Sequence, residues 1–205
     1  MRVGLFGGTF DPPHLGHLAV ARAVRDRFAL DRVLLAPAAV QPLKPDGAHA
    51  GFADRLRMVE LLCAGCTNIE ASAIDAPRPD GSPNFTIDTL HRLRAVLSAE
   101  AEIFVIVGAD AFLGIRQWKS PDDLLREAGW IVVSRPGFDL SALDSLGLTP
   151  EQRAHVEILR DFANPVSATE IRDRLPESEA DDEAATDLVP AKVLEYIKTH
   201  HLYGT

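Results

Sequence analysis

Two histidines lie close together in the segment GGTFDPPHLGH, which occupies residues 7–17. If a helix begins near Leu15, His14 and His17 share one face of its first turn. Two imidazoles at such a place can donate hydrogen bonds to phosphate oxygens, whose negative charge grows in the transition state of a transfer reaction. We therefore interpret His14 and His17 as candidate catalytic residues that act on a phosphate.

The glycines around these histidines are typical of a backbone that approaches a phosphate closely. Gly7 and Gly8 carry no Cβ, which permits both close approach to a ligand and a positive φ. The N-terminus of the following helix attracts anions through its free N–H groups, and Gly16 leaves room there for a base or a ribose. A turn with purely structural histidines is the simpler alternative. It explains one histidine better than two histidines beside a double glycine.

A second candidate phosphate site lies in the segment VSATEIR at residues 166–172. The hydroxyls of Ser167 and Thr169 suit the start of a helix, and capping alone explains both. Arg172 follows within about one turn, and an arginine beside hydroxyls also suits the terminal phosphates of a nucleoside triphosphate. From these residues alone, the cap and the phosphate clamp are equally good interpretations.

Two charged residues follow predicted strands. Lys44 lies between two prolines, so it is either an ordinary solvated lysine or a cation held stiffly enough to reach a reacting phosphate. Asp110 comes shortly after the apolar run at 103–107. It can accept hydrogen bonds from a ribose or cap the next helix, and the sequence leaves both open.

Three further residues are candidates for contacts with a second substrate. Thr86 stands at the start of a predicted helix, where it can act both as the N-cap and as a ligand to a carboxylate. Trp118 can stack on a heteroaromatic ring or pack in an ordinary core. Arg135 directly follows the predicted strand at 130–134. Cys63 and Cys66 form a Cys-x-x-Cys pair without a second ligand pair, and we interpret them as structural.

An alternation of strands and helices must position these residues. Apolar runs predict strands, and spacings of three and four predict helices. The strands are expected at 2–6, 32–36, 69–74, 103–107, 130–134 and 156–159, and the helices at 15–28, 52–62, 86–97, 167–175 and 190–199. This order predicts an α/β fold, a Rossmann-like parallel sheet with helices on both faces. Ligands bind beyond the carboxyl ends of such strands, where several of the candidates fall.

Composition narrows the class of protein. The chain has 205 residues, of which 46% are hydrophobic, and we expect a single domain over 1–205 whose C-terminal helical part, about 165–203, carries the second phosphate motif. The net charge of −9 argues against nucleic acid as a partner. No membrane-spanning run and no secretory signal are visible, and two cysteines fit a reducing compartment, so we expect a cytoplasmic protein. The acidic stretch 177–187 is interpreted as a solvated loop.

The segment GGTFDPPHLGH resembles the first motif of the nucleotidylyltransferase superfamily. With His14 in its place it is more similar to bacterial nicotinate-nucleotide adenylyltransferases than to pantetheine-phosphate adenylyltransferases, which usually have threonine there. The segment 166–172 is similar to the ATP-phosphate motif of the same family, with Ala168 in place of the commoner serine. The family usually has tyrosine where Phe85 stands. The resemblance runs from Arg2 to about Tyr203.

The resemblance implies an activity and a set of site residues. The reaction would join ATP and nicotinate mononucleotide into deamido-NAD and pyrophosphate, with Mg²⁺ bound mainly through ATP phosphates and no protein ligand assigned. The implied catalytic residues are His14, His17 and Lys44. The implied ATP contacts are Gly7, Gly8, Thr9, Phe10, Gly16, Asp110, Ser167, Thr169 and Arg172. The implied substrate contacts are Thr86, Trp118 and Arg135.

Three alternatives remain at this point. The acceptor can be another phosphorylated molecule, such as pantetheine phosphate, in an adenylyl- or cytidylyltransferase. The chain can be a nucleotide-binding regulator without catalysis, although both histidines, Lys44 and Arg172 are present. It can also be a scaffold, which leaves the anion-binding segments unexplained. The sequence does not decide between an acid and an amide acceptor, and a homo-oligomer is compatible with it.

Overall fold

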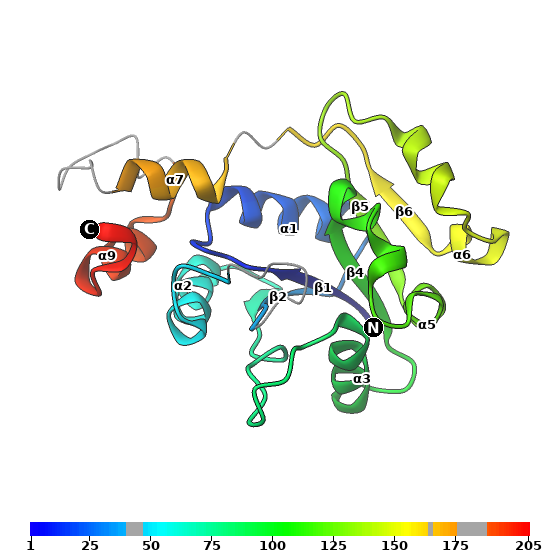
Figure 1. Cartoon of the computed structure of the whole chain (residues 1–205), viewed down its shortest axis with the longest axis horizontal. Coiled ribbons are helices and arrows are strands. Elements are labelled where there is room, and N and C mark those ends of the chain that lie inside the picture. The colour runs from blue at the N-terminus through cyan, green and yellow to red at the C-terminus, as the bar shows by residue number, and fades with distance from the viewer. Residues whose placement is uncertain (40–46, 164–165, 176–187) are drawn as a thin grey trace.

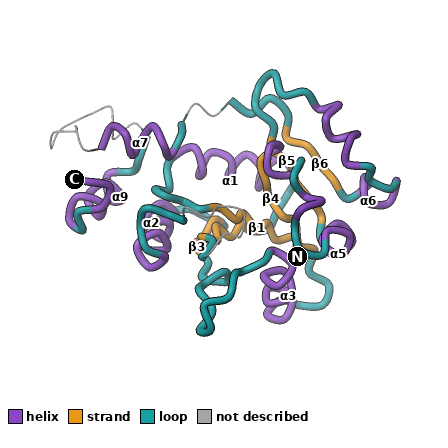
Figure 2. The backbone as a smooth tube through the Cα atoms, viewed as in Figure 1, coloured by secondary structure: helices purple, strands orange, loops and turns teal. Residues whose placement is uncertain are grey.

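The computed structural model describes residues 1–39, 47–163, 166–175 and 188–205. Lys44 and the acidic stretch 177–187 therefore lie outside the described residues. Figure 1 follows the chain from its N-terminus to its C-terminus, and Figure 2 distinguishes its helices, strands and loops.

Six parallel strands form one sheet in the order β3-β2-β1-β4-β5-β6. The strands are β1 (Arg2–Gly8), β2 (Arg32–Pro37), β3 (Ile69–Ala71), β4 (Glu102–Gly108), β5 (Gly129–Val133) and β6 (Val156–Leu159). All six coincide with strands expected from the sequence, although β3 ends three residues earlier than expected. The predicted fold class, a Rossmann-like parallel sheet with helices on both faces, is confirmed.

Helices cover both faces of this sheet (Figure 1). On one face lie α1 (Leu15–Arg27), α2 (Phe52–Cys63), α7 (Ala168–Arg174) and α9 (Ala191–Thr199). On the other lie α3 (Thr86–Val96), α4 (Ala109–Phe112) and α5 (Pro121–Glu127). Among the described residues, the remaining pieces are α6 (Pro150–Ala154) and the 3₁₀ helices η1 (Ile115–Gln117), η2 (Leu140–Leu146) and η4 (Leu202–Gly204). The pieces that the sequence did not predict are α4, α5, α6 and the 3₁₀ helices, all of seven residues or fewer.

Each strand divides its side chains between the two faces, because successive residues of a strand point to opposite sides. In β4, Ile103 and Val105 join the core under α3 and α5, whereas Ile106 joins the core under α1 and α2. Trp130 of β5 is fully buried in the former core, and Ile131 in the latter. Two apolar layers therefore hold the sheet rigidly and fix where its carboxyl edge lies. No helix in the described part of the chain is long and apolar enough to cross a membrane.

Candidate active site

The two halves of the sheet meet between β1 and β4. From β1 the chain proceeds outward to β2 and β3, and from β4 it proceeds in the other direction to β5 and β6. Phe6 of β1 pairs with Ile106 of β4, so Gly7 and Gly8 end their strand beside Gly108. A crevice beyond the strand ends at such a reversal is the general ligand site of open parallel sheets. The first motif lies at this point.

His14 and His17 are in contact at the N-terminus of α1. His14 is the N-cap residue in extended conformation, and His17 is the third residue of the helix. Their ring centroids are 3.7 Å apart with an interplanar angle of 30°. The backbone N–H of His14 donates to Nδ1 of His17 at 3.2 Å, which makes Nδ1 an acceptor and leaves Nε2 to carry the ring proton. The pair therefore has a fixed orientation and a defined tautomer at His17.

Burial keeps both imidazoles neutral. His14 is only 4% exposed, and burial lowers its pKa to about 4. Burial also lowers the pKa of His17 well below its usual value, and the neighbouring His14 adds to this effect. In the absence of an anion, each ring therefore offers one N–H donor rather than a positive charge. A phosphate placed beside them would favour the protonated forms, because an opposite charge raises the pKa of a base.

The turn between β1 and α1 differs from the expected one. Gly7 and Gly8 belong to the strand and do not adopt the positive φ that glycine permits. The left-handed conformation falls on Phe10 instead, with φ of 50°. Phe10 is 2% exposed, and its ring packs edge-on against His17 with centroids 4.8 Å apart. The buried ring of Phe10 thus packs against His17 and limits its movement. Gly7, in contrast, is exposed, and a Cβ added to it would have no atom within 4 Å.

Asp11, in the same turn, was assigned no role by sequence reasoning, yet its side chain accepts several hydrogen bonds. Its carboxylate is buried, and its pKa is lowered by these hydrogen bonds although burial acts in the opposite direction. The donors include the backbone N–H groups of His49 and Ala50 and the hydroxyl of Tyr203, at 2.6, 3.0 and 2.7 Å. Through these hydrogen bonds, Asp11 links the segment at 49–50 and the C-terminal turn at Tyr203 to the turn before α1.

The second motif contacts the first directly. Nη1 of Arg172 donates to the backbone carbonyl of Asp11 at 2.6 Å, and Nη2 donates to Oγ1 of Thr169 at 3.3 Å. Ser167 is the N-cap residue of α7 by position, but its side chain makes no capping hydrogen bond. Because α7 has only seven residues, an anion placed there would depend on its side chains more than on a helix dipole. The structure thus brings Arg172 and the histidine turn together.

The remaining candidates lie at strand ends or helix starts. Asp110 is exposed in the first turn of α4, whose N-cap is Gly108, so the capping interpretation of Asp110 is wrong. Thr86 is the first residue of α3, whose N-cap is Phe85, so Thr86 is not a cap either. Arg135 is exposed just after β5, and its side chain forms no hydrogen bond, ion pair or ring contact with another candidate residue in the described part of the chain.

Trp118 lies at the rim of a core. Its ring is half-buried and meets the buried Trp130 edge-on, with centroids 6.0 Å apart. The next residue, Lys119, connects this loop to the start of α3, because its Nζ lies 3.2 Å from Asp88 and 4.6 Å from the centroid of the Phe85 ring. The loops of Trp118 and Thr86 are therefore neighbours, although nothing joins the two side chains directly.

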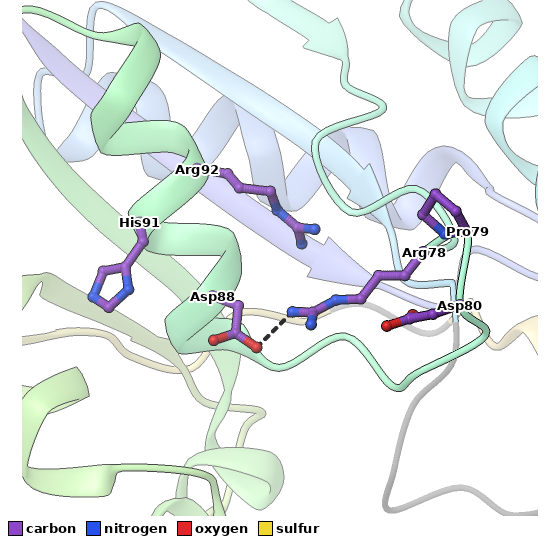
Figure 3. A pocket seen from close by; sticks show the side chains of 6 residues that line it. All are labelled: Arg78, Pro79, Asp80, Asp88, His91 and Arg92. Atoms are coloured by element: carbon purple, nitrogen blue, oxygen red, sulfur yellow. Dashed lines mark hydrogen bonds and ion pairs between the residues drawn. The ribbon is translucent and has the colours of Figure 1, made fainter.

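A cavity of about 580 Å³ opens beside α3, and Figure 3 shows the side chains that line it. It contains none of the predicted site residues. Two of its arginines already face carboxylates: Arg78 donates to Asp88 at 2.6 Å and Arg92 to Asp75 at 3.1 Å. Because both arginines are already paired with carboxylates, they stabilise the loop after β3 and the N-terminal half of α3, and their charge is not free to bind a ligand.

A buried arginine is another residue whose role sequence reasoning missed. Arg55 of α2 is 2% exposed, and it donates to the backbone carbonyls of Ala50 and Thr9 at 3.1 and 2.6 Å. Burial lowers its pKa, although Asp11 opposes this. In the sequence it is one charged residue among several in an amphipathic helix, so no pattern distinguishes it.

Comparison with known proteins gives a consistent result. The sequence model of the cytidylyltransferase-like family matches residues 5–174. A probable nicotinate-nucleotide adenylyltransferase of Solibacter usitatus is 39% identical over 207 residues and covers the whole of both chains. One from Gloeobacter violaceus is also 39% identical, over 98% of this chain and 96% of its own.

Among solved structures, the nicotinic acid mononucleotide adenylyltransferase of Plasmodium falciparum complexed with NaAD shares this fold. The TM-score is 0.74, over 98% of this chain and 97% of that chain, at 16% identity. The likeness in sequence extends over the full length, and the likeness in structure covers nearly all of both chains. The chain therefore belongs to the cytidylyltransferase-like family and, within it, to the nicotinate-nucleotide adenylyltransferases.

Proposed function

We propose that this protein transfers the adenylyl group of ATP to nicotinate mononucleotide, giving deamido-NAD and pyrophosphate, with residues 1–205 acting as one domain. The observation that carries the proposal is the contact between His14 and His17 at the sheet's reversal point. The full-length relatives support the choice of acceptor, since they are described as enzymes for this pyridine nucleotide.

The phosphate of the acceptor is the nucleophile, so the enzyme needs no covalent intermediate. One oxygen of that phosphate forms a bond to the α-phosphorus of ATP while the bond to the β-phosphate bridging oxygen breaks. Catalysis then consists of positioning the two phosphates and stabilising the negative charge that develops. His14 and His17 would donate to the α-phosphate, His17 through Nε2, because its Nδ1 is already an acceptor.

The nucleotide would lie over the strand ends and the start of α1. Gly7 leaves open space for it, and Gly8, Thr9, Phe10 and Gly16 form the adjoining backbone. Asp110, exposed after β4, would accept from the ribose. Arg172, with Ser167 and Thr169 beside it, would hold the leaving pyrophosphate. We assign Lys44 to a reacting phosphate from the family resemblance alone.

The acceptor would occupy the side of the crevice formed by the loops of Thr86 and Trp118. The half-exposed ring of Trp118 offers a surface for the pyridine ring, and Thr86, at the start of α3, would bind the carboxylate. We assign Arg135, which follows β5, to a contact near the adenine of ATP. The positions of these three residues around the carboxyl edge support the assignment.

Nucleotidyltransferases of this kind generally use a divalent metal together with ATP, and we take it to be Mg²⁺. Within residues 1–39, 47–163, 166–175 and 188–205, no group of three or more acidic, histidine or cysteine side chains gathers that could hold a metal. The metal would therefore be bound mainly by phosphate oxygens and water, as Mg²⁺ often is. It would neutralise charge on the triphosphate during transfer.

One assay tests the proposed function. Purified protein with ATP and Mg²⁺ is supplied with nicotinate mononucleotide, its amide analogue or pantetheine phosphate, and pyrophosphate release is followed. We expect release with nicotinate mononucleotide and at least tenfold lower kcat/KM with the other two. Release that is faster with pantetheine phosphate, or ATP binding without any release, would contradict the proposal. The two free cysteines accord with the proposed location in the cytoplasm.

A further inference from the structure

The C-terminal turn of the molecule makes a hydrogen bond to the first motif. The hydroxyl of Tyr203, in the 3₁₀ helix η4, donates to Oδ1 of Asp11 at 2.7 Å across 192 residues of sequence. Asp11 is 4% exposed and Tyr203 is half-buried, so water competes little with this contact. The matched family region ends at residue 174, which places Tyr203 outside it.

The carboxylate of Asp11 accepts hydrogen bonds from this hydroxyl and from two backbone N–H groups. Oδ1 also accepts from the backbone N–H of Ala50 at 3.0 Å, and Oδ2 accepts from that of His49 at 2.6 Å. The ring of His49 lies 3.2 Å from Oδ2 as well. A buried carboxylate needs several such donors, because each replaces a hydrogen bond that water would otherwise make.

The backbone of the same turn is held from two other elements. Arg172 of α7 donates to the carbonyl of Asp11, and Arg55 of α2 donates to the carbonyl of Thr9. Both guanidinium groups are close enough to affect the ionisation of this cluster electrostatically. The turn that precedes His14 is thus fixed through its carbonyls and through one carboxylate, by residues from four separate parts of the chain.

We propose that Asp11 is a positioning residue for adenylyl transfer and that Tyr203 is the residue that holds it in place. Asp11 contacts no reacting atom in this scheme. Its carbonyl sets Arg172 at the leaving pyrophosphate, and its side chain fixes the turn that carries His14. The C-terminal turn is therefore part of the active-site framework. This inference rests on the proposed function.

The chain offers a matched control for this link. Tyr196 in α9 also donates its hydroxyl to a carboxylate, Asp54 of α2, at 2.9 Å. Both tyrosines are half-buried, both lie in the C-terminal part, and each loses one hydrogen bond when replaced by phenylalanine. Tyr196 differs in that its partner Asp54 forms no hydrogen bond or ion pair with residues 7–17 or 166–172, all of which are described. The two variants therefore separate positioning of the site from general stabilisation.

The experiment compares kcat and both KM values for wild type, Tyr203→Phe and Tyr196→Phe, together with their melting temperatures. We expect Tyr203→Phe to lower kcat about tenfold with KM for nicotinate mononucleotide little changed, since one hydrogen bond to a charged group is lost. Tyr196→Phe should keep the wild-type kcat. Melting temperatures should fall by similar small amounts in both.

The Asp11→Asn variant tests the same hydrogen bond from the side of its acceptor. If the two residues act together, Asp11→Asn combined with Tyr203→Phe should be little slower than Asp11→Asn alone. Wild-type kcat in a folded Asp11→Asn protein, or equal kcat in the two tyrosine variants, overturns the positioning role. An inactive wild type contradicts the proposed function instead, so the two failures are distinguishable.

Discussion

The backbone N–H of His14 and the Nδ1 atom of His17 form a hydrogen bond of 3.2 Å inside the first turn of α1. This bond does more than stabilise the start of the helix. It occupies one nitrogen of His17 and so determines which nitrogen is available to a phosphate. The stacking of the two rings then limits how far either can rotate.

Replacing His17 with alanine should lower kcat by 10²-fold or more while the protein stays folded, because a donor to the transition state is lost. The matched control is His91→Ala, which removes an exposed histidine of α3 in contact with Glu127. That variant should keep the wild-type kcat. Pyrophosphate release and circular dichroism measure the two effects, and near-normal turnover in a folded His17→Ala protein would remove His17 from the mechanism.

The buried His14 should make stability depend on pH in a defined range. Its pKa of about 4 in the folded protein lies below the usual 6.5, so the unfolded chain takes up the proton first as the pH falls. The stabilisation is complete above pH 6.5 and is lost progressively towards pH 4. Between pH 7 and pH 5 the free energy of unfolding should fall by about 2 kcal/mol from this residue.

Urea unfolding of wild type and of His14→Gln at both pH values checks this expectation. Glutamine does not titrate, so the variant should lose about 2 kcal/mol less than wild type over the same interval. Equal losses in the two proteins would mean that His14 is not held neutral by burial.

Two glycines should respond differently to alanine. A Cβ at Gly7 meets no atom within 4 Å, whereas a Cβ at Gly129 would lie 2.5 Å from the ring of Phe104. Gly129→Ala should therefore destabilise the fold by about 1–3 kcal/mol. Gly7→Ala should leave the melting temperature nearly unchanged but raise KM for ATP about tenfold, because the methyl group enters the space assigned to the nucleotide. A normal KM for ATP would place the nucleotide elsewhere.

Trp118→Ala should raise KM for nicotinate mononucleotide and change KM for ATP little, since stacking on a pyridine ring contributes on the order of 1 kcal/mol. Trp118→Phe keeps an aromatic surface and should recover most of the affinity. Steady-state kinetics with each substrate varied in turn distinguish the two KM values. Equal increases in both would indicate that Trp118 acts only through its packing on Trp130.

Local patterns predicted the sheet because its central strands are apolar runs, whereas the edge strand β3 alternates apolar and polar residues. They also placed both motifs on the elements that carry them. Helix α5 was missed, since its seven residues give too few turns for a periodic pattern. Helix α7 has the same length, but the hydroxyls of Ser167 and Thr169 indicated where it begins. The N-cap of α3 was misplaced by one residue, from Phe85 to Thr86, because a threonine is the usual cap and phenylalanine is not.

What the sequence could not reveal are contacts between distant residues. Arg55 looks like a solvated helix residue until its two carbonyl partners are known. The glycines permit a positive φ, yet it is Phe10 that adopts one, and burial of its ring against His17 compensates for the backbone strain. Asp11 and Tyr203 are joined only by the completed fold.

The bond between Asp11 and Tyr203 also has a consequence for synthesis on the ribosome. Tyr203 is translated 192 residues after Asp11, so the third donor to this carboxylate emerges long after the carboxylate itself. A nascent chain that has just completed α7 therefore has both motifs and the Arg172–Asp11 contact between them, but lacks the hydroxyl of Tyr203 on Asp11. If Tyr203 positions Asp11 as proposed, full turnover is reached only after the C-terminal turn has folded onto the first motif.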